Sequence, residues 1–567
     1  MKKNRHKVFF LIAGVILMAL LPTPAKAASI LGDEWEKFLE EHVTASGFVE
    51  NATGIAVSHG SRFFDTSNRF DMNRFTIQPE FNVKFMDELK LFLSWKFVKE
   101  PRYNMEAKSR RQAVSPKPVE PLNNTYYDQY GPAPWEAVLT YNPTDRLTLR
   151  WGRQFISWGE TDGVRLLDVI NPQDTTFAPP VAPNLFNLDE TRLPSWGLRT
   201  LYTVNPVTNS IFEFFALPGL DPAKERVDKI MSTNDTSDRT VKYGRWSGHP
   251  ETRLPVGNMF ANPLCGLPIP AVVCRGSGPQ TIIPNVHREL PDAGDSWKIG
   301  TRLTHNFGKL NVGLGYIWGY NPQAGDMVLK MKGSASCFVP VPGCPAPTTV
   351  RLYLQNDRTN IFAAHFNYPV EEVFSLPINS ALRGELAFYP DKPYNISEFP
   401  GRNCTTNAVT GFRAGPSCKY LNQIVEKNTL RYALGFDRTT LIPFLHPDDP
   451  WRAFSLAFQI FQSIIFDHED GIRQFGYAEK IKKVSTLLTF SAGTGYLGDT
   501  ILPSVFLGYD PDGYWVANPA VSYVPPWNEK IRLSLVGAFY GGHNKFKPPL
   551  GSSAEKDSVF LKMRYQF

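Results

Sequence analysis

Hydrophobic and polar residues alternate with a period of two at the C-terminal end of the chain. A β-strand places alternate residues on opposite faces, so residues 557–567 would present one apolar face and one polar face. A strand in lipid needs every backbone polar group paired, which only a closed barrel provides. The apolar face would hold Val559, Leu561, Met563, Tyr565 and Phe567, and the other face Phe560, Lys562, Arg564 and Gln566.

Similar segments recur from Gly47 onward, each about as long as a tilted membrane strand. Short turns between them alternate with long polar segments, and both termini of such a barrel lie in the periplasm, so the number of strands must be even. We therefore predict an all-β fold, a transmembrane antiparallel outer-membrane β-barrel of 18 strands, with 16 strands as the alternative. The predicted strands are 47–58, 69–86, 89–98, 135–142, 146–154, 196–204, 210–217, 296–306, 310–318, 360–368, 380–389, 428–436, 452–463, 484–494, 501–509, 514–523, 530–541 and 557–567.

Both ends of the chain indicate export. Residues 1–27 combine a basic segment, an apolar stretch and the small-x-small ending Ala25-Lys26-Ala27, which is typical of a cleaved signal peptide. A terminal carboxylate directly after an aromatic residue resembles the closing strand of bacterial outer-membrane barrels. We therefore expect the protein in the cell outer membrane, in contact with its lipid.

The segment before the first strand has a helical pattern. Trp35, Phe38, Leu39, His42 and Val43 follow the i, i+3, i+4, i+7, i+8 spacing of an amphipathic helix. We expect this short helix within a segment, 28–46, that either caps the periplasmic mouth or enters the lumen as a plug. The barrel with its long extracellular loops would then occupy 47–567.

Charge and cysteine content narrow the function. The formal charge of +6 includes five cations of the signal segment, so the mature chain is near +1 and no nucleic-acid partner is indicated. The cysteines form three close pairs, which favours three local disulfides in exported loops. No histidine stands at ligand spacing to them, so we predict neither a metal site nor a cofactor. The pairs are Cys265 with Cys274, Cys337 with Cys344, and Cys404 with Cys418.

Alternation also assigns side chains to the lumen. The wall that it predicts is mostly basic, and a basic wall stabilises anions in a narrow pore. Equally, these cations could form structural networks with Glu136, Glu213 and Glu385, and the sequence leaves both interpretations open. The predicted wall residues are Lys90, Lys96, Arg199, Lys298, Arg302, Arg383, Glu385, Arg431, Arg532, Lys562 and Arg564.

The segment after the strand 146–154 differs from an ordinary outer loop. It mixes many large apolar residues with charged ones, so we expect it to pack inside the barrel as a constriction over 155–177. The candidate solute contacts are Arg150, Arg153, Gln154, Trp158, Glu160, Asp162, Arg165, Asp168, Asn171 and Asp174.

This run, from Gly152-Arg-Gln through Ser-Trp-Gly-Glu160 to Asn171-Pro-x-Asp174, resembles a large, poorly characterised Gram-negative outer-membrane barrel family catalogued as a domain of unknown function. Its genes often lie beside inner-membrane exporters of the resistance-nodulation-division type and a periplasmic partner. The resemblance implies an outer-membrane barrel that moves hydrophobic or amphipathic compounds, with such a periplasmic partner. The long segment 218–295 and the three cysteine pairs depart from that pattern.

No nucleophile–base arrangement, His-Glu-x-x-His or phosphate loop is present in the sequence, so we expect no enzyme. The sequence favours a channel or transporter for small solutes; the resemblance implies that these are hydrophobic or amphipathic, and the basic wall, if exposed, favours anionic ones. The alternative is a surface-binding or structural barrel with a closed lumen and disulfide-stapled loops.

Overall fold

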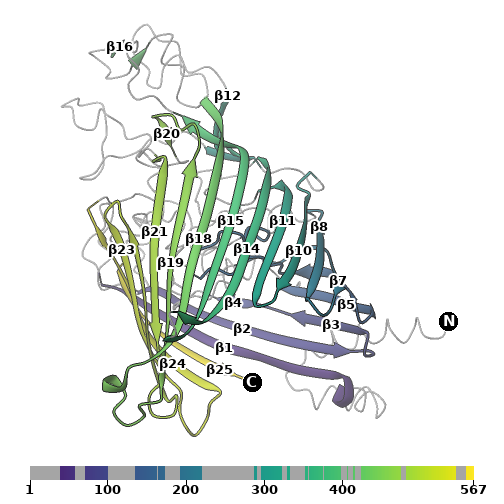
Figure 1. Ribbon diagram of the computed structural model, residues 1–567, viewed down its shortest axis with the longest axis vertical. Helices are drawn as coiled ribbons and strands as arrows, with labels where there is room; N and C mark the ends of the chain where they lie inside the picture. The colour runs from purple at the N-terminus through teal and green to yellow at the C-terminus, as the bar shows by residue number, and fades with distance from the viewer. Residues whose placement is uncertain are drawn as a thin grey trace, which may run out of the picture.

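The protein is described by a computed structural model, in which strands form most of the described part of the chain (Figure 1). No helix among the described residues is long and apolar enough to cross a membrane. The described residues are 39–57, 70–99, 134–162, 164–172, 192–219, 286–289, 295–321, 328–332, 351–355, 357–373, 376–396, 405–406, 413–414, 423–473, 481–543 and 557–567.

Antiparallel pairing links each barrel strand to the next, and β25 pairs with β1, so the sheet closes on itself. β3 and β4 are two parts of one strand, which gives the 18 strands predicted from the sequence. The barrel strands are β1 (Val43–Ala56), β2 (Phe70–Lys84), β3 (Leu89–Ser94), β4 (Phe97–Lys99), β5 (Glu136–Thr144), β6 (Leu147–Gln154), β7 (Ser195–Asn205), β8 (Ser210–Leu217), β10 (Lys298–Phe307), β11 (Leu310–Tyr320), β14 (Arg358–Val373), β15 (Leu376–Ile396), β18 (Gln423–Leu441), β19 (Ala453–Ile465), β21 (Val484–Gly493), β22 (Ile501–Asp510), β23 (Tyr514–Tyr523), β24 (Ile531–Gly542) and β25 (Ser558–Gln566).

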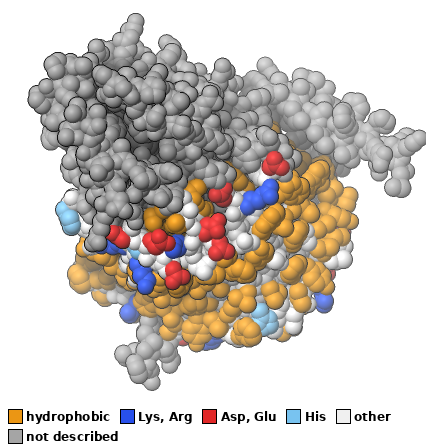
Figure 2. Space-filling view, turned by 90° about the horizontal axis from the view of Figure 1, so that it is seen from above, with side chains coloured by type: hydrophobic (Ala, Val, Ile, Leu, Met, Phe, Trp, Pro, Cys, Tyr) orange, Lys and Arg blue, Asp and Glu red, His pale blue; other side chains and the backbone are white. Residues whose placement is uncertain are grey.

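The C-terminal residue completes the closure. Phe567 donates its backbone N–H to the carbonyl of Gly47 at 3.0 Å, and Gly47 donates to the carbonyl of Phe567 at 3.2 Å. Along β25, Leu561 and Met563 are each 48% exposed, whereas Phe560 between the outward positions is fully buried. The predicted faces of this strand are therefore confirmed, and Figure 2 shows a broad band of hydrophobic side chains on the described surface. Such a band is what a lipid-facing barrel wall requires.

The N-terminal prediction needs a correction. Of the predicted N-terminal helix, the described residues 39–42 are helical, and β1 begins at Val43. Residues 43–46 therefore belong to the barrel and not to the separate segment 28–46. The physical reason is cross-strand pairing, because Val43 lies opposite Val83 and Thr44 opposite Asn82, and each pair adds ladder hydrogen bonds that a helix there would lose. Residues 28–38 lie outside the described part of the chain.

Several further features were not predicted. Pro79 of β2 has no N–H to give the ladder, and the opposite strand is interrupted there between β3 and β4. β14, β15 and β18 run for 16, 21 and 19 residues, well beyond their predicted ranges. The additional short elements are β9 (Val286–Glu289), β12 (Val328–Lys332), β13 (Arg351–Gln355), β16 (Thr405–Thr406), β17 (Arg413–Ala414), β20 (Ile472–Arg473) and the 3-10 helix η4 (Pro443–Leu445).

Candidate functional site

The segment 155–172, which we call the inner loop, follows β6 and packs against the lumen wall. Trp158 and Leu167 are each about 1% exposed, and they join one apolar cluster with lumen-facing residues such as Phe215 of β8 and Ala387 of β15. The indole of Trp158 meets the ring of Phe215 edge-on, with 5.3 Å between the ring centroids. The large apolar residues of this loop are thus buried inside the barrel.

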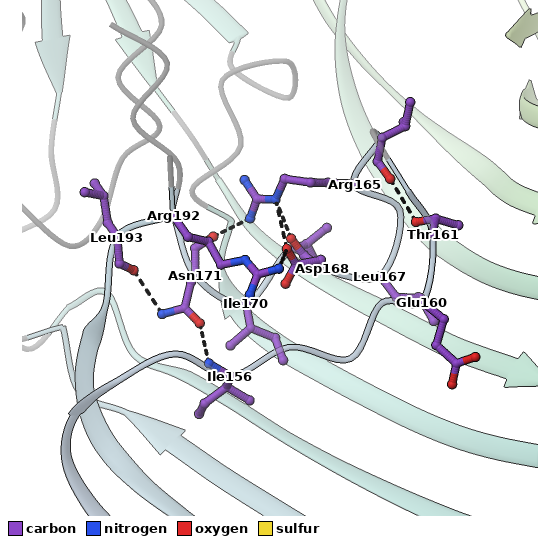
Figure 3. Close-up of polar contacts among 12 residues, drawn as sticks. Ile156, Glu160, Thr161, Arg165, Leu167, Asp168, Ile170, Asn171, Arg192 and Leu193 are labelled. Carbon is purple, nitrogen blue, oxygen red and sulfur yellow. Dashed lines mark hydrogen bonds and ion pairs between the residues drawn. The ribbon is translucent and has the colours of Figure 1, made fainter. Parts of the chain in front are cut away.

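Asn171 joins the two ends of the inner loop. Its side-chain oxygen accepts the backbone N–H of Ile156 at 2.7 Å, and its amide donates to the carbonyls of Leu193 at 3.0 Å and Gln154 at 3.2 Å (Figure 3). The side chain of Asn171 is fully buried. Because every polar atom of a buried amide must find a partner, this residue holds the loop base in one conformation.

Two arginines, one from the inner loop and one from the chain just before β7, contact Asp168 of the inner loop. The guanidinium of Arg192 lies 2.8 Å from the Asp168 carboxylate, and Arg165 donates from Nε to the Asp168 backbone carbonyl at 2.6 Å (Figure 3). Arg165 also donates to the carbonyl of Asn171. Arg165 and Asp168 are therefore engaged in contacts that hold the shape of the loop itself.

The tip of the inner loop is bound by a carboxylate from the barrel wall. Glu385 of β15 accepts the backbone N–H groups of Glu160, of Thr161 at 2.8 Å and of Leu167 at 3.1 Å. Its side chain is 3% exposed. Hydrogen bonds to an ionised group are stronger than neutral ones, so Glu385 is a principal anchor of the loop.

Arg383, two residues earlier on the same face of β15, binds the tip as well. Its guanidinium donates to the Asp162 carboxylate at 2.6 Å, to Asp437 of β18 at 2.8 Å and to the carbonyl of Glu160. Gln459 of β19 donates to the same Asp162 carboxylate at 2.9 Å. Asp162 is thus held by two different strands of the wall.

The opposite part of the loop is held by β10 and β11. The ammonium of Lys298 donates to the carbonyls of Val169 at 3.0 Å and Ile170 at 2.8 Å. Gly315 of β11 lies so close to Trp158 that a Cβ there would be 2.9 Å from the indole Cζ3. A glycine in a strand often marks such a close approach, and here it makes room for the indole.

Glu160 also contacts a histidine of the wall. Nδ1 of His365 on β14 lies 3.2 Å from Oε1 of Glu160. A hydrogen bond with His365 is the main cause that holds the pKa of Glu160 below its usual value, and it outweighs the opposing effect of burial. The inner loop therefore carries one carboxylate whose ionised form is specifically stabilised in the docked position.

Most cations of the predicted basic wall have a carboxylate or an aromatic ring as partner. Glu213 of β8 accepts from Arg199 and from Arg302, both at 2.7 Å. Glu50 of β1 lies 2.6 Å from Arg564 and 3.3 Å from Lys562. Two further cations lie over aromatic rings, Lys96 over Trp135 at 4.7 Å and Arg431 over Tyr389 at 4.9 Å. The sequence left open whether the wall cations are exposed to anions or form a structural network with carboxylates. These residues form a structural network.

The remaining predicted wall cations, together with Arg150 and Arg153, lie at other positions along the barrel strands. Lys90 and Arg150 are on the lumen faces of β3 and β6, and Arg532 is on that of β24, opposite Arg564. Arg153 is buried at the outer end of β6 and donates to the carbonyls of Pro134 at 2.9 Å and Pro194 at 3.3 Å.

Some predictions fall outside the described residues: Asp174, the last part of the predicted constriction at 173–177, and all six cysteines, Cys265, Cys274, Cys337, Cys344, Cys404 and Cys418. Within the described ranges no group of three or more His, Cys, Asp or Glu could hold a metal ion.

Sequence reasoning missed His365, Gln459 and Arg192 as loop contacts, and Asp437 as a partner of Arg383. Alternation alone would have placed His365 and Gln459 in the lumen, because each lies on the inward face of a predicted strand. Nothing in the sequence indicates that they meet residues 160–162, since that contact spans more than 200 positions of the chain for His365 and 297 for Gln459.

A second part of the lumen wall is apolar. Outward neighbours on β22 to β25, such as Leu507, Trp515 and Leu535, are 41% to 55% exposed, so the residues between them face inward. These inward residues are all buried: Phe506, Tyr514, Val516, Val536, Ala538, Tyr540 and Phe560.

Comparison with known proteins gives one family and several structures. A family model described as "Protein of unknown function (DUF1302)" matches residues 8–567. Acinetobacter baumannii OccAB3 is 8% identical, with 93% of this chain and 99% of that chain covered and a TM-score of 0.43. The outer membrane protein OpdK from Pseudomonas aeruginosa is 8% identical over 93% and 99%, with a TM-score of 0.40. The outer membrane channel DcaP of Acinetobacter baumannii is 10% identical over 93% and 97%, with a TM-score of 0.35. No curated protein matches the chain.

Proposed function

This chain belongs to the DUF1302 family, and we propose that it is an outer-membrane channel for small hydrophobic or amphipathic solutes, with the segment 155–177 as its constriction. The observation that carries this proposal is the docking of the inner loop inside a closed barrel by polar side chains of the wall, Glu385, Arg383 and Lys298. A purely structural barrel of this size has no need of a loop bound at its tip and at its base.

The kind of solute follows from the lining. The inward face of β22 to β25 is apolar and buried in this closed state, so the hydrophobic part of a solute would gain contact with it only when the lumen opens. The opposite side, from β7 to β15, is charged. A solute with one apolar and one polar end matches both sides, which favours amphipathic compounds over sugars.

Opening would require release of the loop tip. The tip is held mainly by hydrogen bonds to Glu385 and Arg383, whereas the base is held by the buried side chain of Asn171. Polar contacts can be exchanged for water at modest net cost, but unpacking the apolar part of the loop costs far more. We infer that residues 160–162 move before the rest of the loop.

A closed barrel that binds a partner at its surface is the second candidate. The observation in its favour is the tight burial of the inner loop and of the apolar wall. The disulfide-stapled loops that this alternative invokes lie outside the described residues. A periplasmic partner of an inner-membrane exporter remains a proposal that rests on the family resemblance.

Liposome swelling separates these two candidates. We expect vesicles that contain the purified protein to swell faster in sodium hexanoate than in the sugar arabinose, relative to empty vesicles in each solute. Equal rates with and without protein for both solutes would contradict a channel and favour the closed barrel. Faster swelling in arabinose than in hexanoate would contradict the amphipathic solute class.

A further inference from the structure

One row of lumen-facing residues, near the barrel end that carries the short turns, is strongly cationic. Lys84 on β2 is directly opposite Lys90 on β3, which is opposite Thr140 on β5. Thr140 is opposite Arg150 on β6, and Arg150 is opposite Arg199 on β7. Directly opposite residues of antiparallel strands point to the same side of the sheet, so five neighbouring strands bring four cations to one cross-strand row on the lumen face.

The two central cations of this row differ from the rest of the wall. Lys84 lies 2.6 Å from Asp87, and Arg199 binds Glu213. In contrast, the side chains of Lys90 and Arg150 make no hydrogen bond or ion pair with any residue that the structure describes. Like charges on opposite residues of a sheet are destabilising, so Arg150 beside Arg199 has an energetic cost, which the nearby carboxylates of Glu136 and Glu213 offset only without a direct ion pair to Arg150.

The row is also accessible to water. Lys90 is exposed and Arg150 is half-buried, whereas the apolar wall and the inner-loop core are fully buried. Phe92 of β3 and Leu201 of β7 face the lumen two positions away from Lys90 and Arg199 respectively, so apolar side chains border the row. A site with cations in its centre and apolar groups at its edge suits an amphipathic anion.

We propose that Lys90 and Arg150, flanked by Lys84 and Arg199, form a binding site for the carboxylate of an amphipathic solute. This inference rests on the proposed channel function and gives it a location and a charge preference. A guanidinium binds a carboxylate through paired hydrogen bonds, and the neighbouring ammonium adds a further donor. On β6 the site lies between the turn that precedes Leu147 and the start of the inner loop after Gln154.

Isothermal titration of the purified full-length mature protein with sodium hexanoate, and separately with 1-hexanol, tests the site. We expect hexanoate to bind and Arg150→Gln to weaken its binding about tenfold or more, as for loss of a charged hydrogen-bond partner. Arg150→Lys keeps the charge but loses the paired hydrogen bonds, so it should weaken binding less than Arg150→Gln does, and Lys90→Gln should weaken it independently. The control Lys309→Gln removes an exposed cation of a turn, paired with Glu371, and should leave the affinity unchanged.

Three results would overturn the site: no binding of hexanoate, equal affinity of the wild type and both glutamine variants, or equal affinity for hexanol and hexanoate. Lys90 is exposed, so its variant should fold even if Arg150→Gln does not. Transport is measured separately by swelling. If vesicles swell but hexanoate binding does not depend on Arg150, the binding site is contradicted and the channel function is not. If hexanoate binds but vesicles do not swell, the channel function is contradicted and the binding site is not.

Discussion

Glu213 illustrates how a charge is kept inside the barrel wall. The carboxylate is about 1% exposed and contacts one guanidinium from the strand before it and one from the strand after it. Burial of an ion costs free energy that only close partners can offset. Removal of this single carboxylate would leave Arg199 and Arg302 close together without a counter-charge.

We predict that Glu213→Gln lowers the free energy of unfolding by about 3–5 kcal/mol. Urea unfolding in lipid vesicles, followed by tryptophan fluorescence, measures this change. The matched control is Glu371→Gln, in an exposed ion pair with Lys309, for which about 0–1 kcal/mol is expected. Equal effects of the two substitutions would show that the buried triad is not a major source of stability.

Glu160 predicts a dependence on pH. Its pKa is lowered in the docked loop, chiefly by the hydrogen bond with His365. A lowered pKa means that Glu160 contributes to docking above the pKa of the released loop, and that this contribution is lost as pH falls through the docked value. We therefore expect channel opening to increase below pH 4.5, the ordinary value for this group.

The measurement is single-channel open probability between pH 7 and pH 3, for the wild type and for Glu160→Gln. The variant should show a smaller rise on acidification, because its amide does not titrate. An identical rise in both proteins would assign the pH effect to other carboxylates.

At the scale of elements, the inner loop and the strands around it are matched in shape. Gly315 leaves the space that Trp158 occupies, and Asn171 ties the loop to the strand ends on both sides. Since protein interiors are closely packed, one added methyl group at this contact forces a neighbour to move.

Gly315→Ala should displace the indole of Trp158 and destabilise the protein by about 1–3 kcal/mol, with more frequent channel openings. Thermal unfolding and single-channel recording measure the two effects. Gly493→Ala is the matched control, because a Cβ there would lie 3.5 Å from its nearest neighbour, in ordinary contact. A similar outcome for both alanines would contradict the close packing of Trp158.

The strands could be predicted from the sequence because lipid outside and polar groups inside impose a clean alternation. The strand β15 is an example that the structure confirms: its outward side chains include Leu382 and Leu386, and its inward side chains include Arg383 and Glu385. The contact between Glu385 and the backbone of residues 160–167 could not be predicted, because backbone donors carry no sequence signal and the partners are more than 200 positions apart. The sequence analysis placed the start of the first strand at Gly47, whereas β1 begins at Val43. The reason is related, since the pairing of β1 with β2 overrides a local helical pattern.

At the scale of the whole molecule, three layers are nested. An apolar outer band surrounds the closed sheet, the sheet carries buried ion pairs and an apolar inner wall, and the inner loop lies against that wall. The basic residues near the short turns add an accessible cationic region. In the proposed channel, the inner loop is the movable barrier and this cationic region is the charged site.

The central claim is that the inner loop is a releasable constriction, and single-channel conductance of the wild type and Glu385→Ala in planar bilayers tests it most directly. The substitution removes the acceptor of three loop amides, so we predict an open probability about tenfold higher or more, with larger openings. Glu371→Ala, which removes an exposed carboxylate near the end of β14, should behave as the wild type does. Silence in all three proteins, or identical conductance of the wild type and Glu385→Ala, would contradict the account.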